Sequence, residues 1–70
     1  MTPQDVRERV EEIRRSSQDD ENAHSMEDAL HRDVLAAIAD WQPSQGTLEY
    51  RALCQEALKT MEIDFARWCA

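Results

Sequence analysis

The stretch AHSMEDALHRDVLAAIAD, residues 23–40, decides the fold of this chain. At about 100° per residue, its apolar side chains and the tryptophan that follows fall within an arc of roughly 120° on one side of a helix. These side chains are Met26, Leu30, Val34, Ala37, Ile38 and Trp41. Leu35 lies outside the arc and broadens the apolar surface. A surface of this width predicts a central helix that contacts two neighbouring helices or a partner protein.

The preceding residues predict another helix, over residues 3–15. Thr2 is a typical N-cap, Pro3 suits the first helical position, and Asp5 falls three residues after the cap. A narrow apolar stripe follows at helical spacing and consists of Val6, Val10 and Ile13. Residues 16–22 contain no apolar side chain, so they predict a solvated loop before the central helix.

The residues after the central helix predict a turn and a third helix over residues 47–68. The turn signal is QPSQG at 42–46, and Thr47 is then expected to be the N-cap. Apolar side chains continue at helical spacing through Tyr50, Leu53, Cys54, Ala57, Met61, Phe65 and Trp68. Ile63 falls off this face. We therefore expect a helix that is continuous or slightly kinked near residues 60–64, with a break there as the alternative.

Three predicted helices and no alternating strand pattern indicate a single all-α domain over residues 1–70, built as a small three-helix bundle. A chain of 70 residues is too short for a two-domain enzyme with a deep cleft, and it buries only roughly 60% of its unfolded surface. Such chains often gain stability from a disulfide, a metal or a partner. Cys54 and Cys69 lack the spacing of a disulfide framework, and Cys54 is expected to pack as a small hydrophobe.

The charge balance argues against direct contact with nucleic acid. The chain carries 15 acidic and 8 basic residues and has a net charge of −7, with −5 in residues 1–35 and −2 in residues 36–70. Neither half offers the basic face that a phosphate backbone requires. No stretch approaches the roughly 20 apolar residues of a membrane span, and residues 1–10 lack the apolar core of a signal peptide. We expect a cytoplasmic protein without membrane contact.

His24, Asp28 and His31 form the most suggestive chemical cluster. Their i, i+4, i+7 spacing puts them on one side of a helix, and two imidazoles with a carboxylate can hold zinc or another divalent cation. The spacing differs from HExxH, so ordinary hydrogen bonds of both imidazoles are the alternative. Glu27 and Asp28 diverge by about 100° on a helix, so they are expected to be solvated carboxylates and not an acid/base pair. No catalytic set or cofactor site is predicted.

The apolar side chains on and beside the central arc predict a binding role. Together with an aromatic residue near the C-terminus, the interface candidates are Leu35, Ile38, Trp41 and Trp68. We expect a non-enzymatic protein that binds another protein or itself, as a homodimer in the second case. One alternative is the metal site. Another is an acidic inhibitor whose residues 19–28 occupy the basic groove of a nucleic-acid-binding protein.

Two stretches together resemble small uncharacterised acidic helical proteins of actinobacteria and their phages. They are DENAHSMEDAL at residues 20–30, running on to VLAAIA at 34–39, and the ending EIDFARWCA at 62–70. The resemblance covers most of the chain and agrees with its basic residues, of which seven are Arg and one is Lys. It implies a cytoplasmic accessory protein and assigns no catalytic or binding residue.

Overall fold

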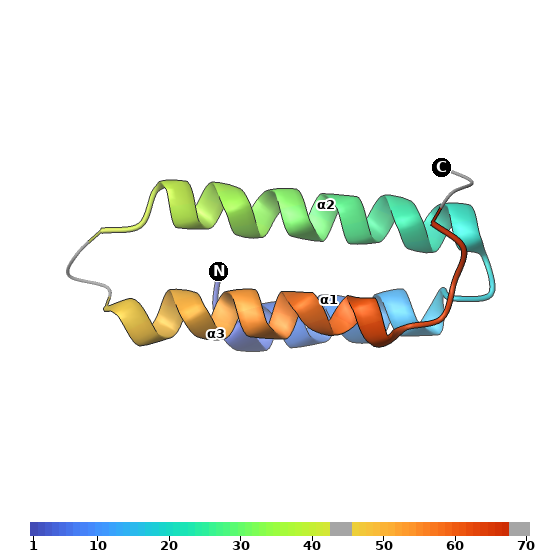
Figure 1. The fold of residues 1–70 in the computed structure, drawn as a ribbon, viewed down its shortest axis with the longest axis horizontal. Helices are drawn as coiled ribbons and strands as arrows, with labels where there is room; N and C mark the ends of the chain where they lie inside the picture. The colour runs from blue at the N-terminus through green and yellow to red at the C-terminus, as the bar shows by residue number, and fades with distance from the viewer. Residues whose placement is uncertain (43–45, 68–70) are drawn as a thin grey trace.

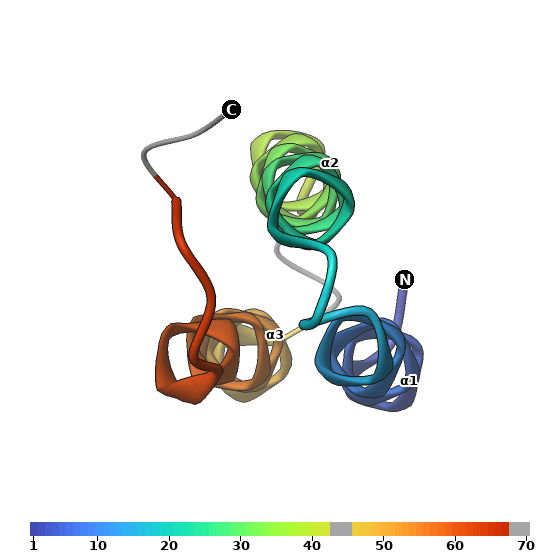
Figure 2. The ribbon, with the colours of Figure 1, turned by 90° about the vertical axis from the view of Figure 1, so that its right-hand side faces the viewer.

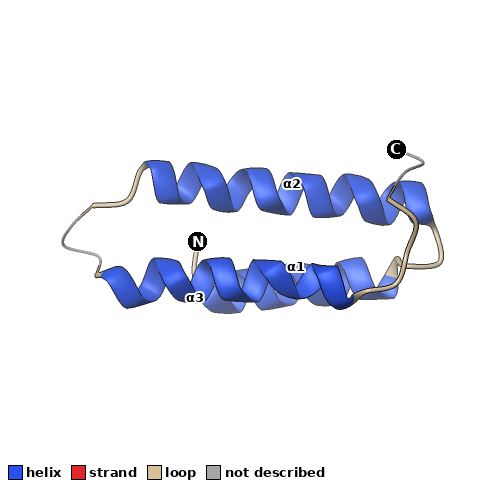
Figure 3. Cartoon of the chain, in the orientation of Figure 1, coloured by secondary structure: helices blue, strands red, loops and turns tan. Residues whose placement is uncertain are grey.

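The computed structural model describes residues 1–42 and 46–67. The elements in chain order are α1 (Pro3–Arg15), α2 (Asp20–Ala39), α3 (Thr47–Leu58) and the 3₁₀ turn η2 (Lys59–Glu62). The helices run side by side along a body of 40 × 18 × 14 Å (Figure 1) and form a triangle when viewed end-on (Figure 2). Within the described ranges the chain is helical or irregular, with no strand (Figure 3). The predicted small all-α bundle of three helices is therefore confirmed.

Helix α1 has the predicted bounds because its N-terminus is closed by a capping box. The Asp5 amide donates to Thr2 Oγ1 at 3.2 Å, and the Thr2 amide donates to Asp5 Oδ2 at 2.8 Å. The hydrogen bond from the Thr2 amide to the Asp5 carboxylate is the main reason why the pKa of Asp5 lies below its ordinary value. The predicted apolar stripe is fully buried and consists of Val6, Val10 and Ile13.

Helix α2 begins at Asp20, three residues before the predicted start at residue 23. Asp19 is its N-cap, and the carboxylate accepts a hydrogen bond from the Asn22 amide at 3.1 Å. Acidic residues expected in a loop thus form the cap and first turn, where the helix dipole favours negative charge. The predicted arc faces the core, with Leu30 and Val34 buried and Met26, Ile38 and Trp41 packed against them.

Helix α3 ends at Leu58, so the prediction of a helix through residue 68 is wrong, and the alternative of a break near residues 60–64 describes the chain better. Thr60 is fully buried in η2, and its Oγ1 donates to the Ala57 carbonyl oxygen at 3.2 Å. A hydroxyl that bonds to a carbonyl one turn back competes with the regular α-helical ladder. The helix therefore tightens into a 3₁₀ turn and stops.

Residues 63–67, which we call the C-terminal strap, have no regular secondary structure and cross from the end of η2 toward α2 (Figures 1 and 2). Ile63 and Phe65 are buried in the core, whereas Met61 is 58% exposed. For a regular helix, the sequence pattern predicts Met61 on the apolar face and Ile63 off it. The 3₁₀ turn changes the angle between successive side chains, so the two residues exchange these positions. Trp68 and Cys69 lie outside the described residues.

Trp41 closes the connection between α2 and α3. Its Nε1 donates to the Gly46 carbonyl oxygen at 3.0 Å, and its ring packs edge-on against Tyr50 with 5.8 Å between centroids. Gly46, at φ 82°, is the N-cap of α3 in place of the expected Thr47. Glycine suits this position because the left-handed region strains residues that carry a Cβ.

Candidate functional site

An apolar hollow of about 290 Å³, which we call the α2–α3 groove, opens between these two helices. It is lined by His31, Val34, Leu35, Ile38, Cys54, Ala57 and Leu58. Val34 and Ala57 are buried, whereas Leu35 from α2 is 68% exposed and Leu58 from α3 is 62% exposed. The groove therefore has a packed floor and one exposed leucine on each wall. Its only lining residue with a polar side-chain nitrogen or oxygen is His31.

The C-terminal strap is tied to α2 by a buried ion pair. Arg67 Nε donates to Glu27 Oε1 at 2.9 Å, and Nη2 donates to Glu27 Oε2 at 3.0 Å. The same Nη2 donates to the Thr60 carbonyl oxygen at 2.8 Å, and the guanidinium lies 4.0 Å from the centre of the Phe65 ring. Glu27 is only 4% exposed, so the expectation that it is a solvated carboxylate is wrong.

The electrostatic surroundings keep Glu27 ionised despite its burial. Burial raises the pKa of the Glu27 carboxyl, but the hydrogen bonds from Arg67, together with the nearby positive charge, outweigh this effect. The pKa of Glu27 is lowered as a result, and the pKa of Arg67 is raised by its hydrogen bonds to Glu27. The pair is therefore a salt bridge that holds the strap against α2.

His31 links α2 to the end of α3 and to η2, which precedes the strap. Its Nε2 lies 3.1 Å from Thr60 Oγ1 and 3.3 Å from the Ala57 carbonyl oxygen. The strap is held further along by the Ala66 amide, which donates to Asp20 Oδ1 at 3.1 Å. Figure 2 shows the strap and α1 on opposite sides of the α2–α3 pair. The strap thus bounds the groove at the N-terminal end of α2.

The structure does not bring His24, Asp28 and His31 together as a set of metal ligands. His24 Nε2 lies 3.4 Å from Asp28 Oδ1, but His31 turns toward α3, where the Thr60 hydroxyl is its neighbour. Across residues 1–42 and 46–67, no group of three or more His, Cys, Asp or Glu side chains is arranged to hold a metal ion. The alternative of ordinary hydrogen bonds describes His31, because a polar partner from another helix is within its reach.

The predicted interface candidates separate into three situations. Leu35 and Ile38 both line the α2–α3 groove. Trp41 is half-buried and makes contacts within the chain, and Trp68 lies outside the described residues. Leu58, which forms the second exposed wall, was missed by the sequence analysis. The signal for it was its position four residues after Cys54, on the same side of α3.

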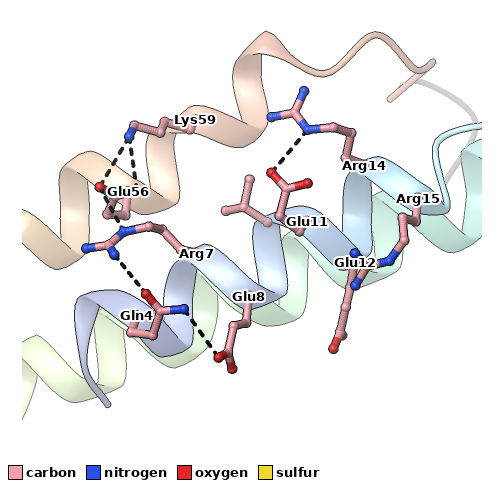
Figure 4. A pocket seen from close by; sticks show the side chains of 10 residues that line it. Gln4, Arg7, Glu8, Glu11, Glu12, Arg14, Arg15, Glu56 and Lys59 are labelled. Atoms are coloured by element: carbon pink, nitrogen blue, oxygen red, sulfur yellow. Dashed lines mark hydrogen bonds and ion pairs between the residues drawn. The ribbon is translucent and has the colours of Figure 1, made fainter.

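A larger hollow, of about 760 Å³, lies between α1 and α3 (Figure 4). Charged side chains of both signs line its rim and pair with one another, since both Arg7 and Lys59 reach the Glu56 carboxylate. Arg7 Nη1 also donates a hydrogen bond to Gln4 Oε1 at 2.8 Å. The hydrogen bond from Lys59 holds the pKa of Glu56 below its ordinary value. Because charges of both signs alternate around it, this hollow favours no single class of ligand.

A comparison with protein families, curated proteins and solved structures finds no match to this chain. None of the helices in the described ranges combines the length and apolar character needed to cross a bilayer. The resemblance to actinobacterial and phage proteins stays a prediction. The α2–α3 groove and the strap beside it are therefore the features from which a function can be argued.

Proposed function

We propose that this protein acts in the cytoplasm by binding a helix of another protein in the α2–α3 groove, without catalysing a reaction. The observation that carries the proposal is the pair of exposed leucines, Leu35 and Leu58, on opposite walls of an apolar groove. Single exposed leucines are ordinary on protein surfaces. Two that flank a buried apolar floor match the way in which grooves take the apolar face of an amphipathic helix.

The architecture supports the same proposal. A bundle of three helices with an apolar groove between two of them has room for the fourth helix of a four-helix bundle. A bound helix would cover Leu35, Leu58 and Ile38, and complete burial of such a side chain contributes about 1.5–3 kcal/mol. A domain of 70 residues has a small core, so this additional buried apolar surface is a large addition to the surface that stabilises the fold.

The arrangement of carboxylates on α2 disfavours the acidic-inhibitor alternative. Glu27 is buried against Arg67, and Asp20 accepts a hydrogen bond from the strap. Asp33 pairs with Arg9 of α1 at 2.8 Å. These carboxylates are engaged within the chain, whereas a mimic of a nucleic-acid backbone needs a continuous row of free ones.

The test is a pull-down with the tagged full-length protein from an actinobacterial lysate, followed by mass spectrometry. The parent is compared with the Leu35→Ala/Leu58→Ala variant and with Leu48→Ala, which removes a leucine that is 80% exposed and lies outside the groove. We expect a stoichiometric partner that is retained by the parent and by Leu48→Ala and is lost from the double variant. A partner retained equally by all three chains would contradict the proposal.

Sedimentation velocity on the same three chains tests whether a second copy of this chain occupies the groove instead. We expect the parent to be a monomer. If the parent is a dimer and only the Leu35→Ala/Leu58→Ala variant is a monomer, the occupant is a second copy of this chain and not a helix of another protein.

A further inference from the structure

We infer that the helix taken by the α2–α3 groove is a basic amphipathic one, with apolar residues over the groove and Lys or Arg residues toward the N-terminal end of α2. The inference rests on the proposed function and specifies the chemistry of the partner. It follows from where the charge of the chain lies, from how that charge continues the groove wall, and from what the strap already binds there.

The negative charge of the chain is concentrated on α2, the helix that contributes one wall of the groove. Residues 19–40, which comprise α2 and its two caps, hold seven carboxylates and one arginine, Arg32, and thus account for −6 of the net charge of −7. Helix α1 is neutral, with four acidic and four basic side chains. A second copy of this chain would bring two such acidic helices together, whereas a cationic helix is attracted to the wall.

The charge is also aligned with the apolar part of that wall. Glu21, Asp28 and Leu35 are spaced seven residues apart, which places them on one stripe of α2. All three are exposed. A helix that covers Leu35 and follows this exposed stripe toward the N-terminus of α2, beside the strap that bounds the groove there, therefore passes Asp28 and then Glu21. The stripe is therefore complementary to a partner helix with an apolar residue at one end and basic residues at the other.

The strap shows that a carboxylate in this part of α2 binds a basic side chain from another segment. Phe65 packs into the core and Arg67 donates two hydrogen bonds to Glu27, so a short apolar and basic sequence already lies against the N-terminal half of α2. Arg67 pairs with Glu27, whereas Asp28, among the residues that the structure describes, pairs only with His24, at 3.4 Å, and keeps 67% of its side chain exposed. Asp28 and Glu21 are therefore the carboxylates within reach of a partner.

The test uses two fluorescein-labelled synthetic amphipathic helices with the same leucine pattern. One carries Lys and Arg at its polar positions, and the other carries Glu. Binding to the full-length protein is followed by fluorescence anisotropy at low and at raised salt. We expect the basic peptide to bind about tenfold or more tightly than the acidic one, and we expect its affinity to fall as salt screens the charges.

Two variants locate the binding on the stripe. Glu21→Gln/Asp28→Asn removes the stripe carboxylates, and Glu12→Gln/Glu49→Gln removes two exposed carboxylates from α1 and α3 as a control with the same net charge. The stripe variant is expected to weaken binding of the basic peptide by about tenfold, and the control variant is expected to retain parental affinity. Circular dichroism verifies that both variants are folded.

The Leu35→Ala/Leu58→Ala variant separates failure of this inference from failure of the proposed function. If the acidic peptide binds as well as the basic one, and both lose affinity in this variant, the groove binds helices but the inferred chemistry is overturned. If binding of the basic peptide is insensitive to this variant and falls equally in both carboxylate variants, attraction to the overall charge explains it, and both proposals are overturned. Absence of binding by the basic peptide overturns the inference alone, because the pull-down decides the proposed function.

Discussion

Arg67 donates two hydrogen bonds, of 2.9 and 3.0 Å, to the buried carboxylate of Glu27, which lies 40 positions earlier in the chain. The contact joins the strap to α2 and closes the end of the bundle where α1 passes into α2. Because a buried carboxylate without a partner is costly, this pair favours a chain that leaves α3 and crosses to α2. The same contact sets the boundary of the α2–α3 groove.

Removing the guanidinium is expected to destabilise the fold. Arg67→Met leaves Glu27 buried without its partner, which should lower the free energy of unfolding by about 1–3 kcal/mol, since part of Arg67 is exposed to solvent. The double variant Glu27→Leu/Arg67→Met should lose less, because it leaves no unpaired charge. Urea unfolding followed by circular dichroism measures both. A double variant less stable than Arg67→Met would argue against a paired-charge origin of the effect.

The salt bridge between Glu27 and Arg67 also predicts how the stability of the fold depends on pH. The pKa of Glu27 is lower in the folded chain than its ordinary value of 4.5, so its ionised form stabilises the fold above that pH, and this contribution is lost as the pH falls through the folded pKa. The stability advantage of the parent over Glu27→Gln should therefore be retained at neutral pH and shrink as the pH falls below 4.5. Urea titrations at several pH values test this. Glu12→Gln, which changes an exposed carboxylate on α1, should follow the parent throughout.

The capping box of α1 predicts a small and specific loss. Thr2→Ala removes the hydroxyl that accepts from the Asp5 amide and should lower the free energy of unfolding by about 1 kcal/mol. Thr2→Ser keeps a capping hydroxyl and should stay within a few tenths of a kcal/mol of the parent. Equal losses in both variants, measured by urea unfolding, would show that the hydroxyl is not the stabilising group.

Substitution by alanine should destabilise the fold strongly at one leucine of α3 and hardly at all at another. Leu53 is fully buried, so Leu53→Ala is expected to cost about 2–5 kcal/mol and to lower the melting temperature strongly. Leu48 is 80% exposed, so Leu48→Ala should change stability by no more than about 0.5 kcal/mol. Thermal unfolding of the two variants provides the comparison, and a large loss in Leu48→Ala would contradict the burial assigned to it.

The helical class and the whole of α1 follow from local patterns in the sequence. Thr2, Asp5 and the stripe from Val6 to Ile13 act through contacts within a few residues of one another, so their spacing alone predicts them. The start of α2 was less well determined, because aspartates such as Asp19 and Asp20 suit both a loop and the first turn of a helix.

The groove and the Glu27–Arg67 pair, in contrast, arise from contacts between distant segments. Glu27 looks like any exposed helical carboxylate until Arg67 meets it from 40 positions away, and His31 turns from a metal candidate to a neighbour of Thr60. Leu58 becomes a groove wall only because the chain leaves the helix after it. Such features depend on how distant segments pack together, and no spacing within one helix carries that information.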